Sequence, residues 1–259
     1  MKKPALLIIF QLCLITTFAQ LKVTNLLCEN LPNPIGLDVT QPRFTWQLQT
    51  TAKNVLQTAY EIKVSEQASL KNILWISGRV SSDRSVHVPY GGKQLESTKQ
   101  YYWQVRVWDN LGNNSGWSAP ASWKMGLLKA DDWKAKWITP GYVEDTINRP
   151  CPLFRKQFSS SKKISSAFVY ITAHGLYEAS INGKRVGNDY LTPGWTSYNK
   201  RLQYQVYDVK NLLQNGNNSI GVTVGSGWYR GTIGWVSQRN AYGRDIALLF
   251  QLDIQYTDG

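Results

Sequence analysis

Cysteine and histidine are scarce in this chain, which holds three Cys and two His among 259 residues. The two histidines, His87 and His174, are far apart in the sequence, and no cysteines are spaced as CxxC. Zinc sites are built from close sets of such ligands, so the sequence argues against one. Cys28 and Cys151 fall in different predicted domains. We therefore expect two buried free thiols rather than a disulfide.

Long hydrophobic runs are absent after the N-terminus. Lys2 and Lys3 precede an apolar run over residues 5–15, and Thr17-Phe18-Ala19, with small residues at its first and last positions, precedes Gln20. This order predicts a secretory signal peptide over residues 1–19. The alternative, a membrane anchor, is disfavoured because the run is shorter than the ~20 residues of a spanning helix. We expect an exported protein, periplasmic or extracellular, with no membrane span once the signal is removed.

The chain also lacks any block of like charge, although its formal net charge is +12. The basic residues are spread along the sequence in short pairs such as Lys162-Lys163 and Lys200-Arg201. A nucleic-acid surface needs the positive charge gathered on one groove with stacking aromatics between the cations. The pattern instead indicates solvated turns and strand edges, so we expect no nucleic-acid partner.

Helical periodicity is nearly absent, and short runs rich in Val, Ile, Tyr, Trp and Thr alternate with polar residues. Gly, Asn and Pro interrupt these runs about every ten residues, which predicts an all-β chain of two consecutive antiparallel β-sandwiches. We expect a fibronectin type III-like sandwich over residues 20–127, a linker over 128–134, and a jelly roll over 135–259 that is truncated at its C-terminus. Less than about a tenth of the chain should be helical, well below the ~30% of ordinary proteins.

Tryptophans at alternating strand positions define the expected core of the first sandwich. Trp46, Trp103 and Trp123 have polar neighbours on both sides in the sequence, so each should point to the buried face of a strand. The alternative is a sugar-stacking face. We favour the core.

The stretch from Tyr204 to Gly231 carries the clearest local signals in the second sandwich. It predicts a strand over 204–207, a helical turn over 208–213 capped by the Asp208 carboxylate, a Gly-Asn turn, and a strand over 219–224. A glycine- and aromatic-rich loop, GSGWYRG, follows. Upstream, Asn182-Gly183 between two alternating runs predicts a hairpin with a type I′ turn.

Several strings occur in an ordered series. The first sandwich holds PRFTW and YYWQVRVWDNLGNNSGWS, and the second holds GLYEASINGKRVG, LTPGWT, YQVYDV and GWYRG. This series resembles the N-terminal modules of bacterial α-L-rhamnosidases over nearly all of the chain after residue 19. The resemblance implies an exported glycoside hydrolase that acts on rhamnose-containing glycans. It also implies that an (α/α)₆ barrel, absent from this sequence, carries the catalytic carboxylates of an inverting mechanism.

No pair of acidic residues in this stretch stands out as catalytic acid and base. The acids of the second sandwich are scattered: Asp131, Asp132, Glu144, Asp145, Glu178, Asp189, Asp208, Asp245, Asp253 and Asp258. We therefore assign no catalytic residue and expect this stretch to be inactive alone. It would contact the catalytic barrel of the full-length chain.

Some members of the family carry a jelly roll that binds rhamnose with the help of calcium, and calcium prefers carboxylate, amide and carbonyl oxygens. Asn188 and Asp189, in the loop after the hairpin, are the candidates for such a site. The alternative is a solvated turn. No other cofactor is expected.

Aromatic side chains near GWYRG are the candidates for contact with a sugar, and Arg230 would donate to its hydroxyls. The same residues would serve equally to pack against the barrel, which we favour. The set is Trp195, Tyr198, Trp228, Tyr229, Arg230 and Trp235.

Two other functions stay open on the sequence. One is a free-standing carbohydrate-binding protein, and the other is the sugar-binding front of a different exo-glycosidase. The last predicted strand, Ile246–Tyr256, ends in an Asp-Gly turn with no returning strand. We expect it to lack a neighbour and to remain an exposed strand edge.

Overall fold

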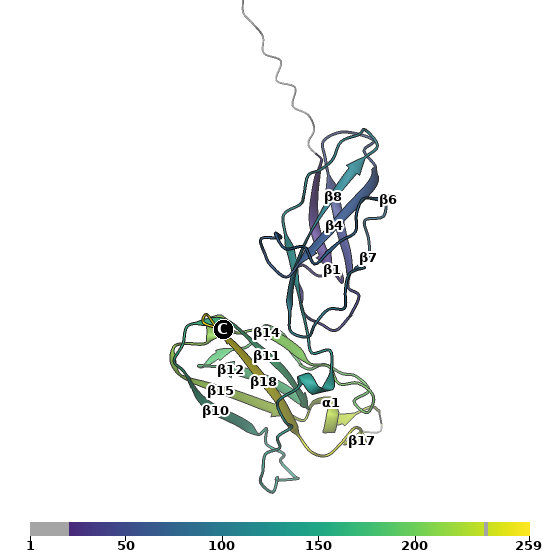
Figure 1. The fold of residues 1–259 in the computed structure, drawn as a ribbon. Helices are drawn as coiled ribbons and strands as arrows, with labels where there is room; N and C mark the ends of the chain where they lie inside the picture. The colour runs from purple at the N-terminus through teal and green to yellow at the C-terminus, as the bar shows by residue number, and fades with distance from the viewer. Residues whose placement is uncertain (1–20, 236–237) are drawn as a thin grey trace, which may run out of the picture. The chain divides into compact units, whose positions relative to one another are not determined.

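The structure is a computed structural model that describes residues 21–235 and 238–259. Strands make up 44% and helices 4% of the chain, which confirms the all-β prediction. The chain divides into two compact units, the first formed mainly by residues 41–93 and 101–122 and the second mainly by 123–259 (Figure 1). The predicted signal peptide lies outside the described residues. No helix in the described part is long and apolar enough to cross a membrane.

The first unit contains two groups of antiparallel strands. One has the order β1-β3-β7, and the other has β4 between β5 and β8, with β6 also paired to β4. Their bounds are β1 Lys22–Cys28, β3 Arg43–Gln49, β4 Gln57–Ser65, β5 Trp75–Ile76, β6 Val80–Ser81, β7 Val88–Pro89 and β8 Gln100–Asp109.

Aromatic side chains fill the core of this unit, as the alternation along its strands predicts. Phe44 and Trp103 are 0% exposed and stack with their ring centroids 4.3 Å apart. Trp46 is also buried, and its indole N–H donates to Oε1 of buried Gln57 at 3.0 Å. Trp123, the first residue of the 123–259 segment of the second unit, is likewise 0% exposed. The interpretation of these three tryptophans as core residues is confirmed.

Two strands depart from the antiparallel expectation. β2 (Ile35–Leu37) and β9 (Ala121–Met125) pair in parallel, with Ile35 opposite Lys124 and Leu37 opposite Met125. Parallel neighbours need a long crossover connection. The two strands are more than 80 residues apart in sequence, so local patterning gives no sign of their pairing.

The second unit is a sandwich of two sheets, with strand orders β10-β15-β12-β13 and β14-β11-β18 (Figure 1). The bounds are β10 Leu153–Ser160, β11 Ile164–His174, β12 Leu176–Ile181, β13 Lys184–Arg185, β14 Gln205–Asp208, β15 Gly216–Gly225 and β18 Ala247–Tyr256. A small hairpin, β16 Thr232–Ile233 and β17 Gln238–Arg239, lies apart from them. The short helices are η1 Ala130–Asp132, η2 Lys210–Leu212 and α1 Gly227–Arg230.

Strand β11 is the centre of one sheet, since it pairs with β14 on one side and β18 on the other. Its side chains Ala167, Val169 and Ile171 are 0% exposed and face the core, as predicted. Ile181 of β12 and Val224 of β15, from the opposite sheet, are equally buried in the same cluster. The two sheets thus share one hydrophobic core.

The predicted turns of this unit are present. Asn182 and Gly183 both have positive φ, 52° and 77°, as a type I′ turn requires. Gly216 has φ of 89° at the start of β15. Asp208 Oδ1 accepts a hydrogen bond from the Lys210 backbone N–H at 3.0 Å. The helical turn is shorter than predicted, however, and Val209 rather than Asp208 occupies its N-cap position.

Two other expectations are corrected. Cys28 is buried, but Cys151 is exposed just before β10, where the chain has not yet entered the sandwich. The prediction of two buried thiols is therefore wrong for Cys151, although both are free. The final strand, β18, does not lack a neighbour, because it pairs with β11 from Ala247 to Tyr256. It remains the edge of its sheet.

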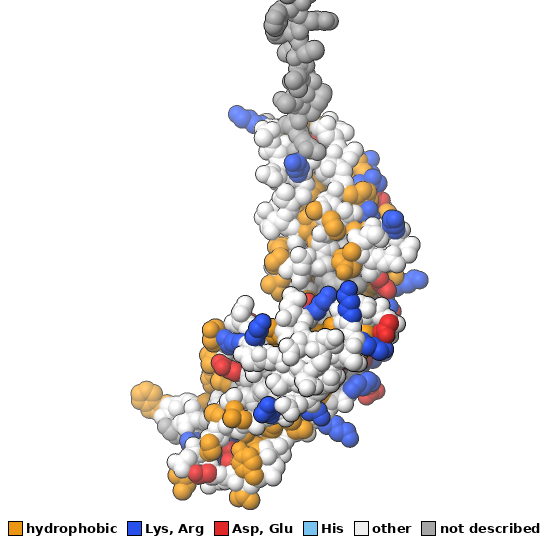
Figure 2. All heavy atoms as spheres, turned by 90° about the vertical axis from the view of Figure 1, so that its left-hand side faces the viewer, with side chains coloured by type: hydrophobic (Ala, Val, Ile, Leu, Met, Phe, Trp, Pro, Cys, Tyr) orange, Lys and Arg blue, Asp and Glu red, His pale blue; other side chains and the backbone are white. Residues whose placement is uncertain are grey.

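On the face drawn in Figure 2, Lys and Arg side chains are scattered over both units, with Asp and Glu among them.

Asn218 is the polar residue whose loss should most weaken the second unit. It is 2% exposed, accepts from the side chain of Asn182 at 2.8 Å, and donates to the carbonyl oxygens of Gln214 and Gly216. Asn218→Ala leaves these groups unsatisfied and should lower the free energy of unfolding by about 1–3 kcal/mol. Urea denaturation checks this against Asn217→Ala, an exposed neighbour that should change little. Equal effects of the two substitutions would contradict the role of this network.

Candidate functional site

An aromatic cluster surrounds helix α1 at one end of the second unit. Its members come from five separate segments of the chain and are Trp137, His174, Trp195, Tyr198, Trp228, Tyr229 and Tyr242. Helix α1 supplies two of them, and His174 is the last residue of β11. The cluster brings together four of the residues predicted from the sequence as a sugar-binding or packing site.

Three rings form a continuous stack within the cluster. His174 stacks between Trp137, at 4.4 Å and 27°, and Tyr229, at 4.6 Å and 11°. Tyr198 meets Tyr229 edge-to-face at 5.5 Å, and Tyr242 meets Tyr198 at 4.9 Å. Aromatic pairs in these geometries stabilise a fold by about 0.5–1.5 kcal/mol beyond their burial. The stack therefore fixes the position of Tyr229.

Trp195 and Trp228 form an outer pair on this cluster. Their rings are nearly parallel, at 6°, with centroids 5.7 Å apart. Trp195 is 55% exposed and Trp228 is half-buried. The indole N–H of Trp195 donates to the Tyr242 hydroxyl at 3.1 Å, and the Tyr198 hydroxyl donates to the Gly194 carbonyl at 2.8 Å. The pair presents ring surface to solvent, whereas the Trp195 N–H and the Tyr198 hydroxyl already donate hydrogen bonds within the second unit.

Trp235 lies elsewhere. It follows the short strand β16 and is fully exposed, and within the described residues no ring contact joins it to the cluster. The structure thus does not bring Trp235 together with the other predicted site residues.

Arg230 is buried, with 1% exposure, in contrast to the surface position that donation to a ligand would require. Its guanidinium binds Glu144 in a bidentate manner, with Nη2 to Oε1 at 2.6 Å and Nη1 to Oε2. Nε donates to Ser226 Oγ at 3.1 Å. A buried cation needs such a paired and hydrogen-bonded environment. Arg230 therefore ties α1 to the segment that carries Glu144.

Glycine permits the tight packing around α1 at two positions. Gly227 has φ of +50°, and a Cβ there would lie 2.4 Å from Cγ of Leu176. A Cβ on Gly243 would lie 2.1 Å from the Tyr229 hydroxyl. Side chains at these positions would displace α1 and Tyr229. The GSGWYRG string, predicted as a loop, thus forms a single helical turn held from both sides.

The titratable groups of the site have shifted pKa values with clear causes. The hydrogen bonds from Arg230 lower the pKa of Glu144, which keeps this carboxylate ionised. Burial lowers the pKa of His174, so the ring in the stack is neutral at neutral pH. Burial raises the pKa of Tyr198 and of Tyr229, which remain protonated.

The calcium candidates lie in a separate place, near the β12–β13 hairpin. Asp189 Oδ2 accepts from the Tyr207 hydroxyl at 2.9 Å, and the Asp189 carbonyl accepts from Nη2 of Arg185 at 2.7 Å. The described residues contain no group of three or more His, Cys, Asp and Glu that would hold a metal ion. Calcium would need further oxygens, from amides or carbonyls.

Sequence reasoning missed four residues of the site. Glu144 was one scattered acid among several, and Tyr242 gave no signal at all. Trp137 and His174 lie in the strings WKAKWI and ITAHG, but the resemblance gives them no role. Each comes close to α1 only through the fold.

Comparison with known proteins finds two matching sequence families. Residues 23–129 match the family described as "Rha78A-like, N-terminal immunoglobulin domain", and residues 162–259 match "Alpha-L-rhamnosidase N-terminal domain". The immunoglobulin and fibronectin type III folds share the sandwich architecture seen in the first unit. The chain corresponds to the N-terminal region of α-L-rhamnosidases.

Similar proteins support this family. An α-L-rhamnosidase of Formosa agariphila is 37% identical over 89% of this chain and 26% of its own length, and one of Alteromonas sp. is 36% identical with the same coverage. The solved α-L-rhamnosidase of Aspergillus terreus superposes with a TM-score of 0.83 at 37% identity. It is covered over 28% of its length, while 92% of this chain is matched. The chain thus spans about a quarter of the length of these α-L-rhamnosidases. All members of the aromatic cluster except Trp137 lie within residues 162–259, which match the rhamnosidase N-terminal domain.

Substitution of Glu144 by Gln tests the buried ion pair. The folded-state pKa of Glu144 is lowered. The ion pair with Arg230 therefore stabilises the fold fully above the unfolded-state pKa of about 4.3, and this stabilisation is lost as the pH falls through the folded-state pKa. Glu144→Gln should lower the free energy of unfolding at pH 7 by about 1–3 kcal/mol. In this variant the free energy of unfolding should also decrease less as the pH is lowered below ~5. Denaturation from pH 7 to 3 measures both.

The matched control is Glu178→Gln. Glu178 faces Arg185 at 3.6 Å but is 69% exposed, so its removal should change stability by less than about 0.5 kcal/mol. If Glu144→Gln behaved like this control at every pH, the ion pair would not hold α1 in place.

Proposed function

We propose that this stretch is the accessory N-terminal part of an exported α-L-rhamnosidase, and that hydrolysis takes place in a catalytic barrel outside it. The main support is that the order of the sequence strings, the sequence identity and the fold all agree with α-L-rhamnosidases over about nine-tenths of this chain, but over only about a quarter of those proteins. The full enzyme would remove terminal α-L-rhamnose from glycans with inversion, one carboxylic acid protonating the leaving oxygen and one carboxylate activating water.

Neither Glu144, which pairs with Arg230 beside the aromatic cluster, nor Glu178 suits that chemistry. An inverting hydrolase needs a protonated acid and an ionised base about 6.5–9.5 Å apart. Glu144 is held ionised by the buried Arg230, so it would make a poor proton donor. Glu178 is exposed on the hairpin beside Arg185. The cluster therefore has a role other than catalysis.

Packing against the catalytic barrel is the role that the cluster fits better. A sugar site combines ring surface with a few free polar groups that fix the sugar hydroxyls. Here Arg230 is buried, and Trp195, Tyr198 and Tyr242 use polar atoms within the cluster. What remains outward is mainly ring surface of Trp195 and Trp228, which suits a protein partner.

Carbohydrate binding is the second candidate, supported by the nearly parallel, solvent-facing rings of Trp195 and Trp228. Such rings also fit the apolar face of a deoxy sugar. Calcium at Asn188 and Asp189 would then assist. The hydrogen bond that Asp189 already accepts from Tyr207 would compete with that ion.

Residues 20–259 should show no hydrolysis of a chromogenic α-L-rhamnoside, because the catalytic carboxylates are placed in the barrel. The release of chromophore is measured against a buffer blank and against the full-length enzyme as positive control. Turnover by the fragment that survives repeated purification would refute the assignment of catalysis to the barrel.

A binding titration distinguishes the two proposed roles of the cluster, packing against the barrel and carbohydrate binding. L-Rhamnose should bind residues 20–259 with millimolar or weaker affinity, about −4 kcal/mol or less favourable, with calcium or with a chelator. Calorimetry measures this for the unchanged fragment, for Trp228→Ala, and for Trp117→Ala in the first unit as a control. Tight, calcium-dependent binding that only Trp228→Ala abolishes would establish a sugar site in place of packing.

A further inference from the structure

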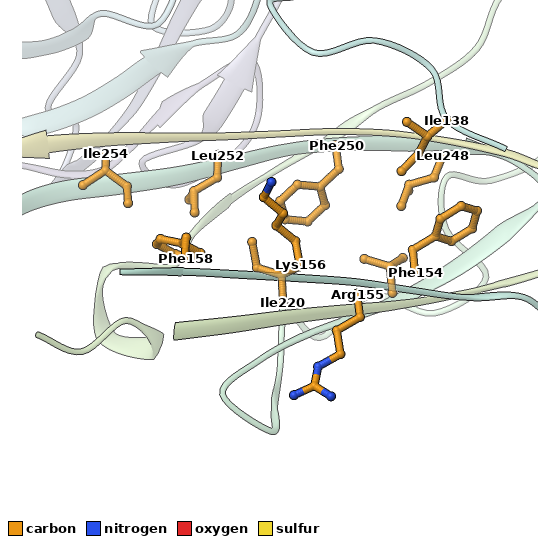
Figure 3. Close-up of a pocket in the computed structure, with 11 residues that line it drawn as sticks. Ile138, Phe154, Arg155, Lys156, Phe158, Ile220, Leu248, Phe250, Leu252 and Ile254 are labelled. Carbon is orange, nitrogen blue, oxygen red and sulfur yellow. The ribbon is translucent and has the colours of Figure 1, made fainter. Parts of the chain in front are cut away.

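Two surfaces outside the aromatic cluster differ sharply in composition. In the second unit, apolar side chains of β10 and β18 face each other across a groove, and aliphatic and phenyl groups make up most of its lining (Figure 3). In the first unit, the outer face of the sheet that contains β4 and β8 carries alternating cations and indole rings. Only this second surface has the charge and the hydrogen-bond donors to recognise a polar partner.

Strand alternation places the side chains of this outer face. Successive residues of a strand point to opposite faces of the sheet. Ile62 of β4 and Val105 of β8, which lie opposite each other in the pairing, are 0% exposed and face the core. Their neighbours Lys63 and Arg106, together with Trp108 two residues further along β8, therefore point outward, where they are half-buried.

Five side chains form a row on this face, called here the cation–indole ladder: Lys63, Trp117, Arg106, Trp108 and Arg79. Lys63 Nζ lies 4.2 Å from the centroid of the Trp117 ring. Arg106 Cζ lies 4.7 Å from the Trp117 ring and 5.0 Å from the Trp108 ring, and Arg79 Cζ lies 4.6 Å from the Trp108 ring. All four contacts fall within the ~6 Å over which a cation is attracted to a ring. Each indole thus has two cations over it.

The loop that carries Trp117 is fixed to β8 on both sides of this residue. The Ser118 N–H donates to the Val105 carbonyl at 2.9 Å, and the Ser115 N–H donates to the Val107 carbonyl at 3.0 Å. The hydroxyls of the same two serines accept from the Val105 and Val107 N–H groups at 3.2 and 3.0 Å. A surface that is ordered before binding loses less conformational entropy when a ligand arrives.

Positive charge exceeds negative charge along the ladder. Glu61, opposite Arg106 in the pairing, accepts from Arg106 Nε at 2.6 Å and forms an ion pair with its Nη2 at 2.5 Å. Among the residues that the structure describes, Lys63 and Arg79, at the two ends of the ladder, form no ion pair. Their N–H groups are therefore available to an anion from outside.

We propose that the cation–indole ladder binds the acidic groups of a polysaccharide, either uronic acid carboxylates or sulfate esters. Lys63 and Arg79 donate to the oxygens of such groups in charge-assisted hydrogen bonds. The choice of a glycan as partner rests on the proposed function, since an accessory part of a glycoside hydrolase has a polysaccharide as its neighbour. The ladder then holds the enzyme on an acidic polysaccharide during hydrolysis elsewhere in the protein.

The contacts of the indole rings make a neutral sugar or a nucleic acid a poorer partner. A neutral sugar stacks its apolar face on an open aromatic ring, and the bases of a single strand stack in the same way. The rings of Trp108 and Trp117 are half-buried and already lie against two cations each. The ladder therefore offers charged donors rather than ring faces, and acidic groups match them.

Binding to three polysaccharides tests the proposal. Residues 20–259 should bind polygalacturonate, which carries only carboxylates, or dextran sulfate, which carries only sulfates, and should not bind uncharged dextran. The acidic polymer that binds more tightly identifies the preferred anionic group. Affinity should fall as the NaCl concentration rises, because salt screens exposed charges. Biolayer interferometry with each polysaccharide immobilised measures these affinities.

Substitution of the two end cations tests the role of the ladder itself. Lys63→Gln combined with Arg79→Gln should raise the Kd for the acidic polymer at least about tenfold, because two charge-assisted contacts are lost. The matched control, Lys22→Gln with Lys93→Gln, removes the same charge at exposed positions of the first unit outside the ladder. It should change the Kd by less than about twofold. Lys63→Arg with Arg79→Lys keeps both charges and should bind like the unchanged protein.

Several outcomes would overturn the proposal. Equal weakening by the Gln pairs inside and outside the ladder would mean that binding follows the net charge of the chain. Lack of binding to both acidic polysaccharides, or equally tight binding to dextran, would also exclude an acidic-glycan site. Tighter binding of poly-L-glutamate than of either acidic polysaccharide would assign the ladder to an acidic protein. Hydrolysis of a chromogenic α-L-rhamnoside is a separate measurement, so failure of these binding tests leaves the proposed function standing.

Discussion

The buried guanidinium of Arg230 is the group on which the aromatic cluster depends. A cation with 1% exposure is tolerated only if its charge and its N–H groups are matched, and Glu144, 86 residues away, supplies the bidentate partner. Because Arg230 follows Tyr229 in a single helical turn, this pair sets the position of the Tyr229 ring. The rings of His174 and Trp137 then stack on it in order. One ion pair thus connects a loop, a helical turn and the end of the central strand.

The fold could be predicted from the sequence wherever the deciding forces are local. Alternation along a strand identifies its buried face, as for Trp46 and Ile171, and positive φ at Asn182 and Gly183 follows from the residue types alone. The parallel pairing of β2 with β9 and the exposure of Cys151 depend on segments distant in sequence, and neither was foreseen. The pattern of a strand specifies its faces but not its neighbour.

The candidate site could be predicted only in part, for the same reason. An arginine in a glycine- and aromatic-rich string suggests a donor for a ligand, and nothing in the string indicates a carboxylate 86 residues earlier. Burial of Arg230 changes its role from recognition to support. Trp195 and Trp228, by contrast, lie together as the sequence suggests, since the fold stacks their rings with the centroids 5.7 Å apart. Trp235, predicted with them, lies apart and fully exposed.

Whether its polar groups already have hydrogen-bond partners indicates what the second unit can bind. Groups that bind a sugar must be free to pair with its hydroxyls, because a hydroxyl that is buried without a partner costs about 1–3 kcal/mol. The cluster uses the Trp195 indole N–H and the Tyr198 hydroxyl internally, so neither group is free to bind a sugar hydroxyl. This use of polar atoms supports the proposed packing role of the cluster over carbohydrate binding.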